Sequence, residues 1–233
     1  MIRSPKGRAA RELSVFVPIV AATSLLFTLI LYPAVGISRA APVPGRTLMA
    51  LGLVWWFVGR RPGGWEMIGL KAFRPVSKML LLTFAFFAFD LLVMQRITDF
   101  AVQLLQLDRP DRGVFDHIHG NTWAYIGWLL LAIGVGGFAE EVVMRGYLMT
   151  RLTEILGGTR VGLVGALVLQ AVLFGAGHAY VGTAGFVSGT LTALMFGAFY
   201  LISGRNLWPV IIVHAVWDIL GLTLIYSVGT PST

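Results

Sequence analysis

Long apolar stretches, separated by short polar segments, run through the whole sequence. Seven of them reach or approach the roughly 20 residues that an α-helix needs to cross a bilayer. They are Leu13–Ile37, Pro42–Val58, Ser77–Met94, Thr122–Val143, Val161–His178, Gly185–Ser203 and Leu207–Tyr226. The second is the weakest, because its purely apolar part, Leu48–Val58, is short for a bilayer. The pattern predicts an all-α fold, a polytopic transmembrane helix bundle of about seven spans.

The composition agrees with a membrane protein and excludes several kinds of site. Charged residues make up only 12% of the 233 residues, whereas about a quarter of a soluble domain is charged. The sequence contains no cysteine, so no disulfide, thiolate nucleophile or cysteine-metal site can form. Although the net charge is +7, no stripe of Lys and Arg is interleaved with exposed aromatic residues, so we expect no nucleic-acid partner.

Basic residues in the connecting segments predict how the chain is oriented. If the N-terminus is cytoplasmic and all seven stretches cross, most of the 18 Lys and Arg residues lie on the cytoplasmic side, as the positive-inside rule requires. Residues 1–121 are then accessory spans, with an amphipathic cytoplasmic segment at Gly59–Lys78 and a polar outer loop at Gln95–Asn121. Residues 122–227 form a second unit, which contains most of the candidate chemistry.

Six acidic or histidine residues lie in or beside the apolar stretches. An ionisable group in hydrocarbon is costly, so each is a candidate site residue. Five fall in the last hundred residues, whereas Asp90 stands alone in the third span and is better explained as a structural carboxylate. The six are Asp90, Glu140, Glu141, His178, His214 and Asp218.

Two adjacent glutamates are predicted to have different roles. Glu141 and Arg145 are four residues apart, so they share a helix face in the favourable acid-first order and can form a structural ion pair. Glu140 points about 100° away and has Met144 at its own i+4 position. The unpaired carboxylate suits a general base or acid, whereas the alternative is that both glutamates serve Arg145 in a packing network.

Two histidines are predicted to meet Glu140 at one depth in the membrane. His214 and Asp218 are one helical turn apart, so the carboxylate can orient the imidazole. Treating Gly157-Gly158 as the turn of a helical hairpin places Glu140 and His178 at similar heights. His214 reaches the same depth if this hairpin projects by about 10 Å into the cytoplasm. The fifth span then ends within the membrane, and Ala179–Ala184 form a loop that admits water to a cavity.

Together these motifs resemble a family signature. Glu140-Glu141-x-x-x-Arg145, Phe174-x-x-x-His178 and His214-x-x-x-Asp218 are similar to the motifs of the CPBP family, the Rce1-type CAAX-processing and bacteriocin-immunity-associated (Abi) intramembrane proteases. The resemblance covers about Thr122–Tyr226. It implies a protease in which Glu140 and His178 activate water, His214 and Asp218 position the water or stabilise the oxyanion, and Arg145 holds Glu141. Many members carry Asn where this chain has Asp218, and Asp is a poor hydrogen-bond donor unless protonated.

The resemblance leaves the use of a metal open. Glu140, His178 and His214 form a His₂Glu set like that of several hydrolytic zinc sites, so Zn²⁺ or another divalent cation is one alternative. A metal-free reaction with Glu140 as base beside a histidine is the other. His117 and His119, beside Asp116, are better explained as a polar loop than as a metal site.

The expected activity is hydrolysis of a peptide bond in a membrane-associated protein or peptide, in a multi-pass membrane protein whose site faces the cytoplasm. The family implies CAAX-type processing, but no residue requires a prenylated substrate. One alternative is a non-catalytic scaffold or bacteriocin-immunity factor of the same fold. Another is an ion transporter, which lacks support because no continuous polar path joins Asp90 to Glu140.

Overall fold

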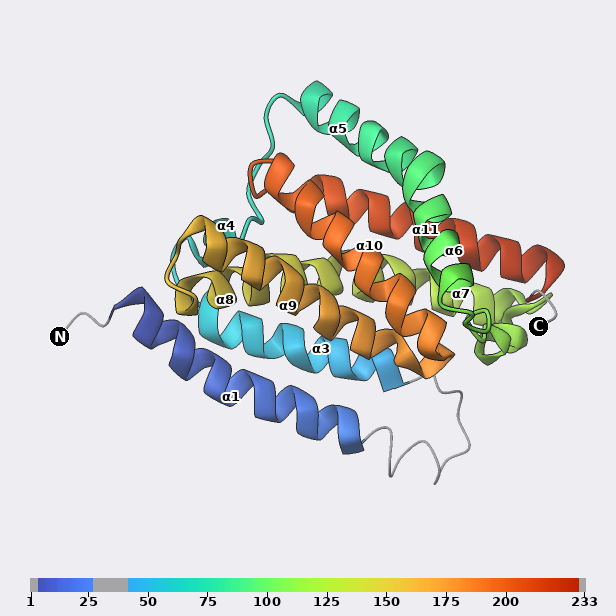
Figure 1. Cartoon of the computed structure of the whole chain (residues 1–233), viewed down its shortest axis with the longest axis horizontal. Coiled ribbons are helices and arrows are strands. Elements are labelled where there is room, and N and C mark those ends of the chain that lie inside the picture. Colours follow the sequence, from blue (N-terminus) through green and yellow to red (C-terminus); the bar gives the residue numbers. More distant parts are fainter. Residues whose placement is uncertain (1–3, 27–41, 231–233) are drawn as a thin grey trace.

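The computed structural model describes residues 4–26 and 42–230, and every regular element in these ranges is a helix. Most helices run along the long axis of the bundle (Figure 1). Within the described ranges, six are long and apolar enough to cross a membrane: Pro5–Leu26, Val76–Leu104, Thr122–Ile155, Arg160–Val181, Thr183–Ile202 and Trp208–Val228. The all-α transmembrane fold predicted from the sequence is confirmed.

The first two predicted spans form a pair of packed helices. Helix α1 (Pro5–Leu26) accounts for the first, and the rest of that predicted span, residues 27–37, lies outside the described residues. The second consists of α3 (Pro42–Val54) and a π-helical turn, η2 (Trp55–Gly59). Its apolar part, Val43–Gly59, is roughly 25 Å long at 1.5 Å per residue, which is less than the hydrocarbon thickness of a bilayer.

The third predicted span continues further than its polar end suggests. It consists of α5 (Val76–Phe89), a π-helical stretch η3 (Asp90–Met94) and α6 (Gln95–Leu104). The outer loop expected from Gln95 therefore begins only after Leu104. The polar residues of α6 are the solvent-facing side of an amphipathic helix, whose other side packs against α10 (Thr183–Ile202).

The segments between the long helices contain only short elements. The expected amphipathic segment Gly59–Lys78 has a single helical turn, α4 (Gly64–Met67), bounded by glycines with positive φ at Gly63 and Gly69. The outer loop contains a 3-10 helix, η4 (Gly113–Ile118). In place of the expected water-admitting loop at Ala179–Ala184, one 3-10 turn, η7 (Ala179–Val181), and Gly182 lead directly into α10.

A single helix of 34 residues, Thr122–Ile155, carries the glutamate motif. It comprises α7 (Thr122–Leu131), two π-helical stretches η5 (Ala132–Glu140) and η6 (Val142–Leu148), and α8 (Met149–Ile155). Gly157 and Gly158, with φ of +90° and +68°, form the expected turn. The hydroxyl of Thr159 then caps α9 (Arg160–His178) by accepting from Gly162 N at 3.1 Å.

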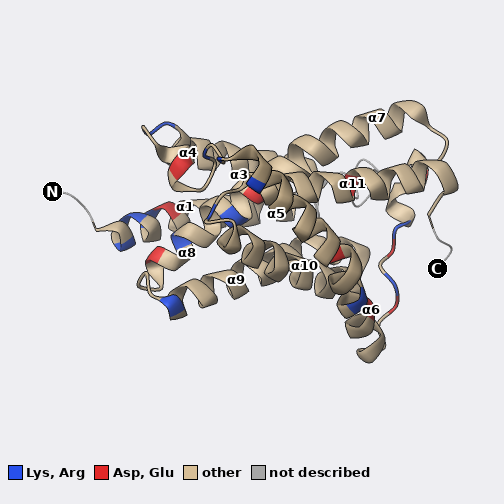
Figure 2. Cartoon of the chain, turned by 90° about the horizontal axis from the view of Figure 1, so that it is seen from above, with Lys and Arg blue, Asp and Glu red and all other residues tan. Residues whose placement is uncertain are grey.

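The ends of the bundle are uneven and differ in charge. The α8–α9 turn extends further toward the N-terminal end than the turn between α10 and α11 (Trp208–Val228), and the α9–α10 turn stops short of the far ends of α7 and α11 (Figure 1). Lys and Arg gather at the N-terminal end (Figure 2). There the buried carboxylate of Glu12 joins α1 to Arg151 of α8, with N–O distance 2.7 Å, and to Arg61, at 3.0 Å.

Candidate active site

Glu141 lies at the centre of a buried ion network between the long helix and α11. Its Oε1 accepts hydrogen bonds from Arg145 Nη1 at 2.9 Å and from His214 Nδ1 at 2.7 Å. The side chains of Glu141 and Arg145 are both 0% exposed. Because a carboxylate only accepts, His214 Nδ1 carries a hydrogen, and the bond fixes the tautomer and the ring orientation.

Aromatic rings enclose the guanidinium of Arg145. Its Cζ lies 4.5 Å from the ring centroid of Phe174 on α9 and 5.5 Å from that of Phe196 on α10. Such cation–π contacts add to the ion pair where water is excluded. Arg145 therefore ties four helical segments together around Glu141, which explains why this carboxylate is committed to structure.

Glu140 has no such partner. It is 9% exposed, and within the described residues neither a hydrogen bond nor an ion pair reaches its carboxylate. The carboxylate interacts electrostatically with His178, His214 and Asp218, so the three motifs meet in one cluster. The chain therefore places one free carboxylate, at the end of η5, beside the two histidines.

His178 is the last residue of α9 and is held by Phe174. Its Nδ1 lies 2.9 Å from the carbonyl oxygen of Phe174, and the two rings stack with centroids 4.3 Å apart. Since a carbonyl oxygen only accepts, Nδ1 is the donor, and the neutral ring keeps its lone pair on Nε2. The Phe174-x-x-x-His178 spacing thus fixes the tautomer of His178 and leaves one nitrogen free for chemistry.

Asp218 is not the residue that orients His214. Its Oδ2 is 3.8 Å from His214 Nε2, which is too long for a hydrogen bond, so the expected carboxylate-imidazole bond within α11 is replaced by the bond to Glu141. Asp218 instead faces Gly136 of η5, where a Cβ would collide with Oδ2. The glycine allows the half-buried carboxylate to approach the backbone of the helix that carries Glu140.

A metal does not fit these residues as they are arranged. Among the described residues, no three His, Asp or Glu side chains are placed to hold one ion. Each histidine donates through Nδ1, to Phe174 O or to Glu141, and keeps only Nε2 for a ligand. We therefore derive no step through the His₂Glu set that the sequence suggests.

Arg46 and Tyr180 are site residues that the sequence analysis missed. Tyr180 in η7 interacts electrostatically with Glu140, Asp218 and Arg46 of α3. The sequence alone could have indicated Arg46, because it is an ionisable residue inside the predicted span Pro42–Val58. The cost of burying a charge in hydrocarbon applies to basic residues as well as to acidic ones. Nothing in the sequence distinguishes Tyr180 except that it follows His178 by two positions.

The other ionisable residues considered lie apart from this cluster. Asp90 is 3% exposed, and its Oδ1 accepts from Gln95 Nε2 at 3.3 Å. His117 Nε2 accepts from Trp128 Nε1 at 2.8 Å. The Asp116 carboxylate accepts from the hydroxyl of Thr230. The first bond lies within one helix, and the other two connect η4 to α7 and to the residue that follows Gly229.

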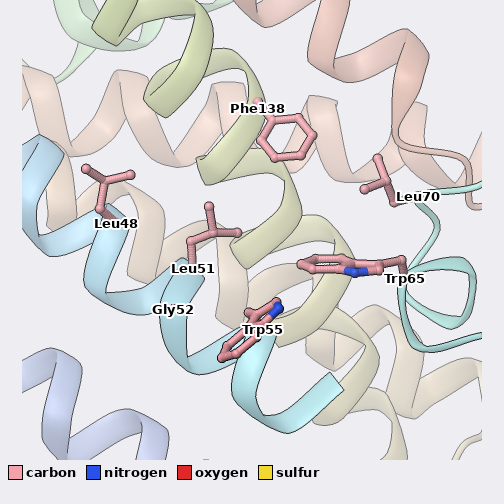
Figure 3. A pocket seen from close by; sticks show the side chains of 7 residues that line it. All are labelled: Leu48, Leu51, Gly52, Trp55, Trp65, Leu70 and Phe138. Atoms are coloured by element: carbon pink, nitrogen blue, oxygen red, sulfur yellow. The ribbon is translucent and has the colours of Figure 1, made fainter. Parts of the chain in front are cut away.

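An apolar cavity of about 600 Å³ lies on the α3 side of the long helix. Figure 3 shows Leu48 and Trp55 on one wall, Trp65 across from them, and Phe138 projecting from η5. Phe138 precedes Glu140 by two residues, which point to nearly opposite sides of a helix, and none of Glu140, His178 and His214 lines the cavity.

Part of the chain matches the model of a known protein family. Residues 122–220 match the family model "Rce1-like: Type II CAAX prenyl endopeptidase Rce1-like". This part of the chain is an Rce1-like domain. The Rce1-like domain contains Glu140, His178, His214 and Asp218, whereas Arg46 lies outside it. The match covers less than half of the chain and supports the family resemblance for residues 122–220. No curated protein and no solved structure matches the chain significantly.

Proposed function

We propose that this protein is an intramembrane endopeptidase that uses Glu140 as its general base. The observation that carries the proposal is the difference between the two glutamates. Glu141 accepts hydrogen bonds from Arg145 and His214, whereas Glu140 has no such partner among the described residues and interacts electrostatically with both histidines. A free carboxylate beside an oriented imidazole is an arrangement that can activate water.

The reaction follows from the free groups of the site. Glu140, with His178 Nε2 as a second acceptor, removes a proton from water, and the water oxygen forms a bond to the carbonyl carbon of the scissile peptide. The tetrahedral intermediate then loses its C–N bond, and the proton passes from Glu140 to the leaving amine. His214 positions the water, because Glu141 fixes its ring, and Asp218 acts as a further orienting acceptor.

We propose that the substrate is a membrane-associated protein or peptide carrying an apolar group. The apolar cavity supports this, because it lies along the same long helix as Glu140 and is lined by aliphatic and aromatic side chains. A prenylated cysteine near a chain terminus is the substrate that the name of the matching family suggests.

We further propose that the basic end of the bundle is cytoplasmic and that the site opens toward that side. The positive-inside rule supports the first point. The second is supported by the place of His214, which lies six residues from the start of α11 and so about 9 Å from that end.

Cleavage of a defined peptide by the purified full chain tests the activity. The probe is a fluorescent peptide that ends in a farnesylated cysteine and three aliphatic residues. We expect cleavage by the wild type and by Glu66→Gln, an exposed control with the same chemical change. Loss by a factor of at least about 100 is expected for Glu140→Gln, as for removal of a general base.

The same assay separates the alternatives. Because the described residues provide no three-ligand set, we expect activity to survive a chelator, and loss that Zn²⁺ restores would show that a metal is required. Full activity of Glu140→Gln would overturn the assigned base. A wild type that cleaves nothing, yet retains binding to membrane partners in both forms, would indicate a non-catalytic scaffold.

A further inference from the structure

Arg46 reaches the candidate site from outside the Rce1-like domain. Its Nη2 donates to the carbonyl oxygen of Gly177 at 3.2 Å, one residue before His178. The guanidinium also interacts electrostatically with His178 and Tyr180. A cation from α3 is therefore fixed beside the last turn of α9, within the cluster that contains Glu140.

In the part of the chain that the structure describes, this cation lacks a carboxylate partner, since no Asp or Glu forms an ion pair with Arg46. The remaining residues, 1–3, 27–41 and 231–233, contain no Asp or Glu. Arg145 and Arg151, by contrast, are both paired. A half-buried guanidinium in an apolar helix is costly, and with five N–H donors it has capacity left for an anion.

Gly177 allows the guanidinium to take this position. A Cβ at residue 177 would lie 3.2 Å from Nη2 and 3.8 Å from Cζ of Arg46. A methyl group here would require the guanidinium to shift by a few tenths of an ångström. The glycine thus lets Arg46 lie against the backbone of α9 one residue before His178.

We propose that Arg46 binds the free C-terminal carboxylate of the substrate, so that the enzyme cleaves a few residues from a chain end. The inference rests on the proposed endopeptidase function. The planar fork of arginine matches a carboxylate through two parallel hydrogen bonds. An extended peptide advances about 3.3–3.6 Å per residue, and Arg46 contacts the residue next to His178, so only a short peptide fits between the carboxylate and the scissile bond.

A structural role makes a different prediction. The last carbonyl groups of a helix have no partner within it, and Arg46 satisfies one of them in α9. If this were its whole function, replacing Arg46 would disturb His178 and lower kcat for every peptide alike, whatever its C-terminus.

The test uses the full chain in phosphatidylcholine nanodiscs and the farnesylated peptide in two forms, with a C-terminal carboxylate and with a C-terminal amide. We expect the wild type to prefer the acid, through a KM lower by about tenfold or more, as for one charge-assisted contact. In Arg46→Gln the acid-to-amide ratio should fall to about one, and Arg46→Lys should restore part of it. Equal loss of kcat for both peptides would overturn the proposal.

Binding separates this inference from the activity on which it rests. Anisotropy of the labelled peptides is measured on Glu140→Gln and on Glu140→Gln combined with Arg46→Gln. If the wild type binds the acid selectively through Arg46 but cleaves neither peptide, the carboxylate site stands and the proposed protease activity is wrong. If it cleaves both peptides without preferring the acid, the protease activity stands and the carboxylate site is wrong. If added phosphatidylglycerol changes peptide binding only when Arg46 is present, and the acid is not preferred over the amide, Arg46 binds a lipid phosphate and the proposal is wrong.

Discussion

Glu140 and Glu141 are identical side chains at neighbouring positions, yet their surroundings differ. Glu141 is 0% exposed and accepts from two side chains on two helices. Glu140 accepts from none among the described residues and borders the cluster of histidines. A buried carboxylate with charged partners supports the fold, and an unpaired one is available for proton transfer.

Glu141→Gln is expected to destabilise the protein. The amide leaves Arg145 buried without a counter-ion, and removing one partner of a buried pair costs about 3–5 kcal/mol. The free energy of unfolding in mixed micelles measures the loss. Glu140→Gln is the matched control, and we expect its stability to equal that of the wild type. Equal destabilisation of the two variants would contradict the division of roles.

The contacts of individual residues could be predicted only within one helix. The four-residue spacing of Glu141 and Arg145 indicates their pairing, because neighbours on a helix face are fixed by its geometry. The bond from His214 to Glu141 joins residues 73 positions apart, and no spacing reports how α11 crosses the long helix. The sequence pointed instead to Asp218, whose Oδ2 lies 3.8 Å from His214 Nε2, within ion-pair distance but too far for a hydrogen bond.

At the scale of elements, the crossing of α11 over η5 depends on glycine. A Cβ at Gly137 would lie 2.7 Å from the Cβ of Ala215 and 3.1 Å from its Cα. Because those atoms belong to the backbone or lie next to it, they cannot move aside without displacing α11. Small residues that let helix backbones approach are a general feature of membrane bundles.

Gly137→Ala is expected to weaken this crossing. Overpacking of a close contact costs about 1–3 kcal/mol, and the shift of α11 should also move His214 and lower activity. Gly134→Ala, on the same stretch but with nothing within 4 Å of its added Cβ, is the control. Thermal unfolding and peptide cleavage are measured on both. A fully stable and active Gly137→Ala would show that the helices are free to separate here.

The long helices could be predicted from apolar runs, but their ends and internal geometry could not. The run Ser77–Met94 ends at a polar segment, which proved to be the amphipathic α6 because polar residues also cover the exposed face of a helix. The π-helical stretches η5 and η6 have no counterpart in the hydrophobic pattern. They depend on packing between helices.

Most Lys and Arg residues lie toward the N-terminal end of the molecule (Figure 2). The positive-inside rule predicts that this end is cytoplasmic. The orientation can be tested directly, because the sequence contains no cysteine. Ser77→Cys, at the start of α5, and Ser227→Cys, near the end of α11, place single exposed thiols at opposite ends.

We expect a membrane-impermeant maleimide to label Ser77→Cys only in inside-out vesicles and Ser227→Cys only in right-side-out vesicles. A water-soluble peptide substrate should likewise be cleaved only by inside-out vesicles, if the site opens to the cytoplasm. Reversed labelling would invert the orientation, and cleavage in right-side-out vesicles alone would move the entrance to the other face.

The two π-helical stretches also determine how side chains before and after them are rotated relative to each other about the axis of the long helix. Each π turn contains more residues than an α turn, so the extra residues determine which direction every later side chain faces. Deleting one residue between Ala132 and Glu140 would rotate one side of the helix by about 100° relative to the other. Glu140 and its flanking motif would then be out of register with α7, which precedes the π-helical stretch. In this part of the chain, length is constrained as strictly as the identity of the residues.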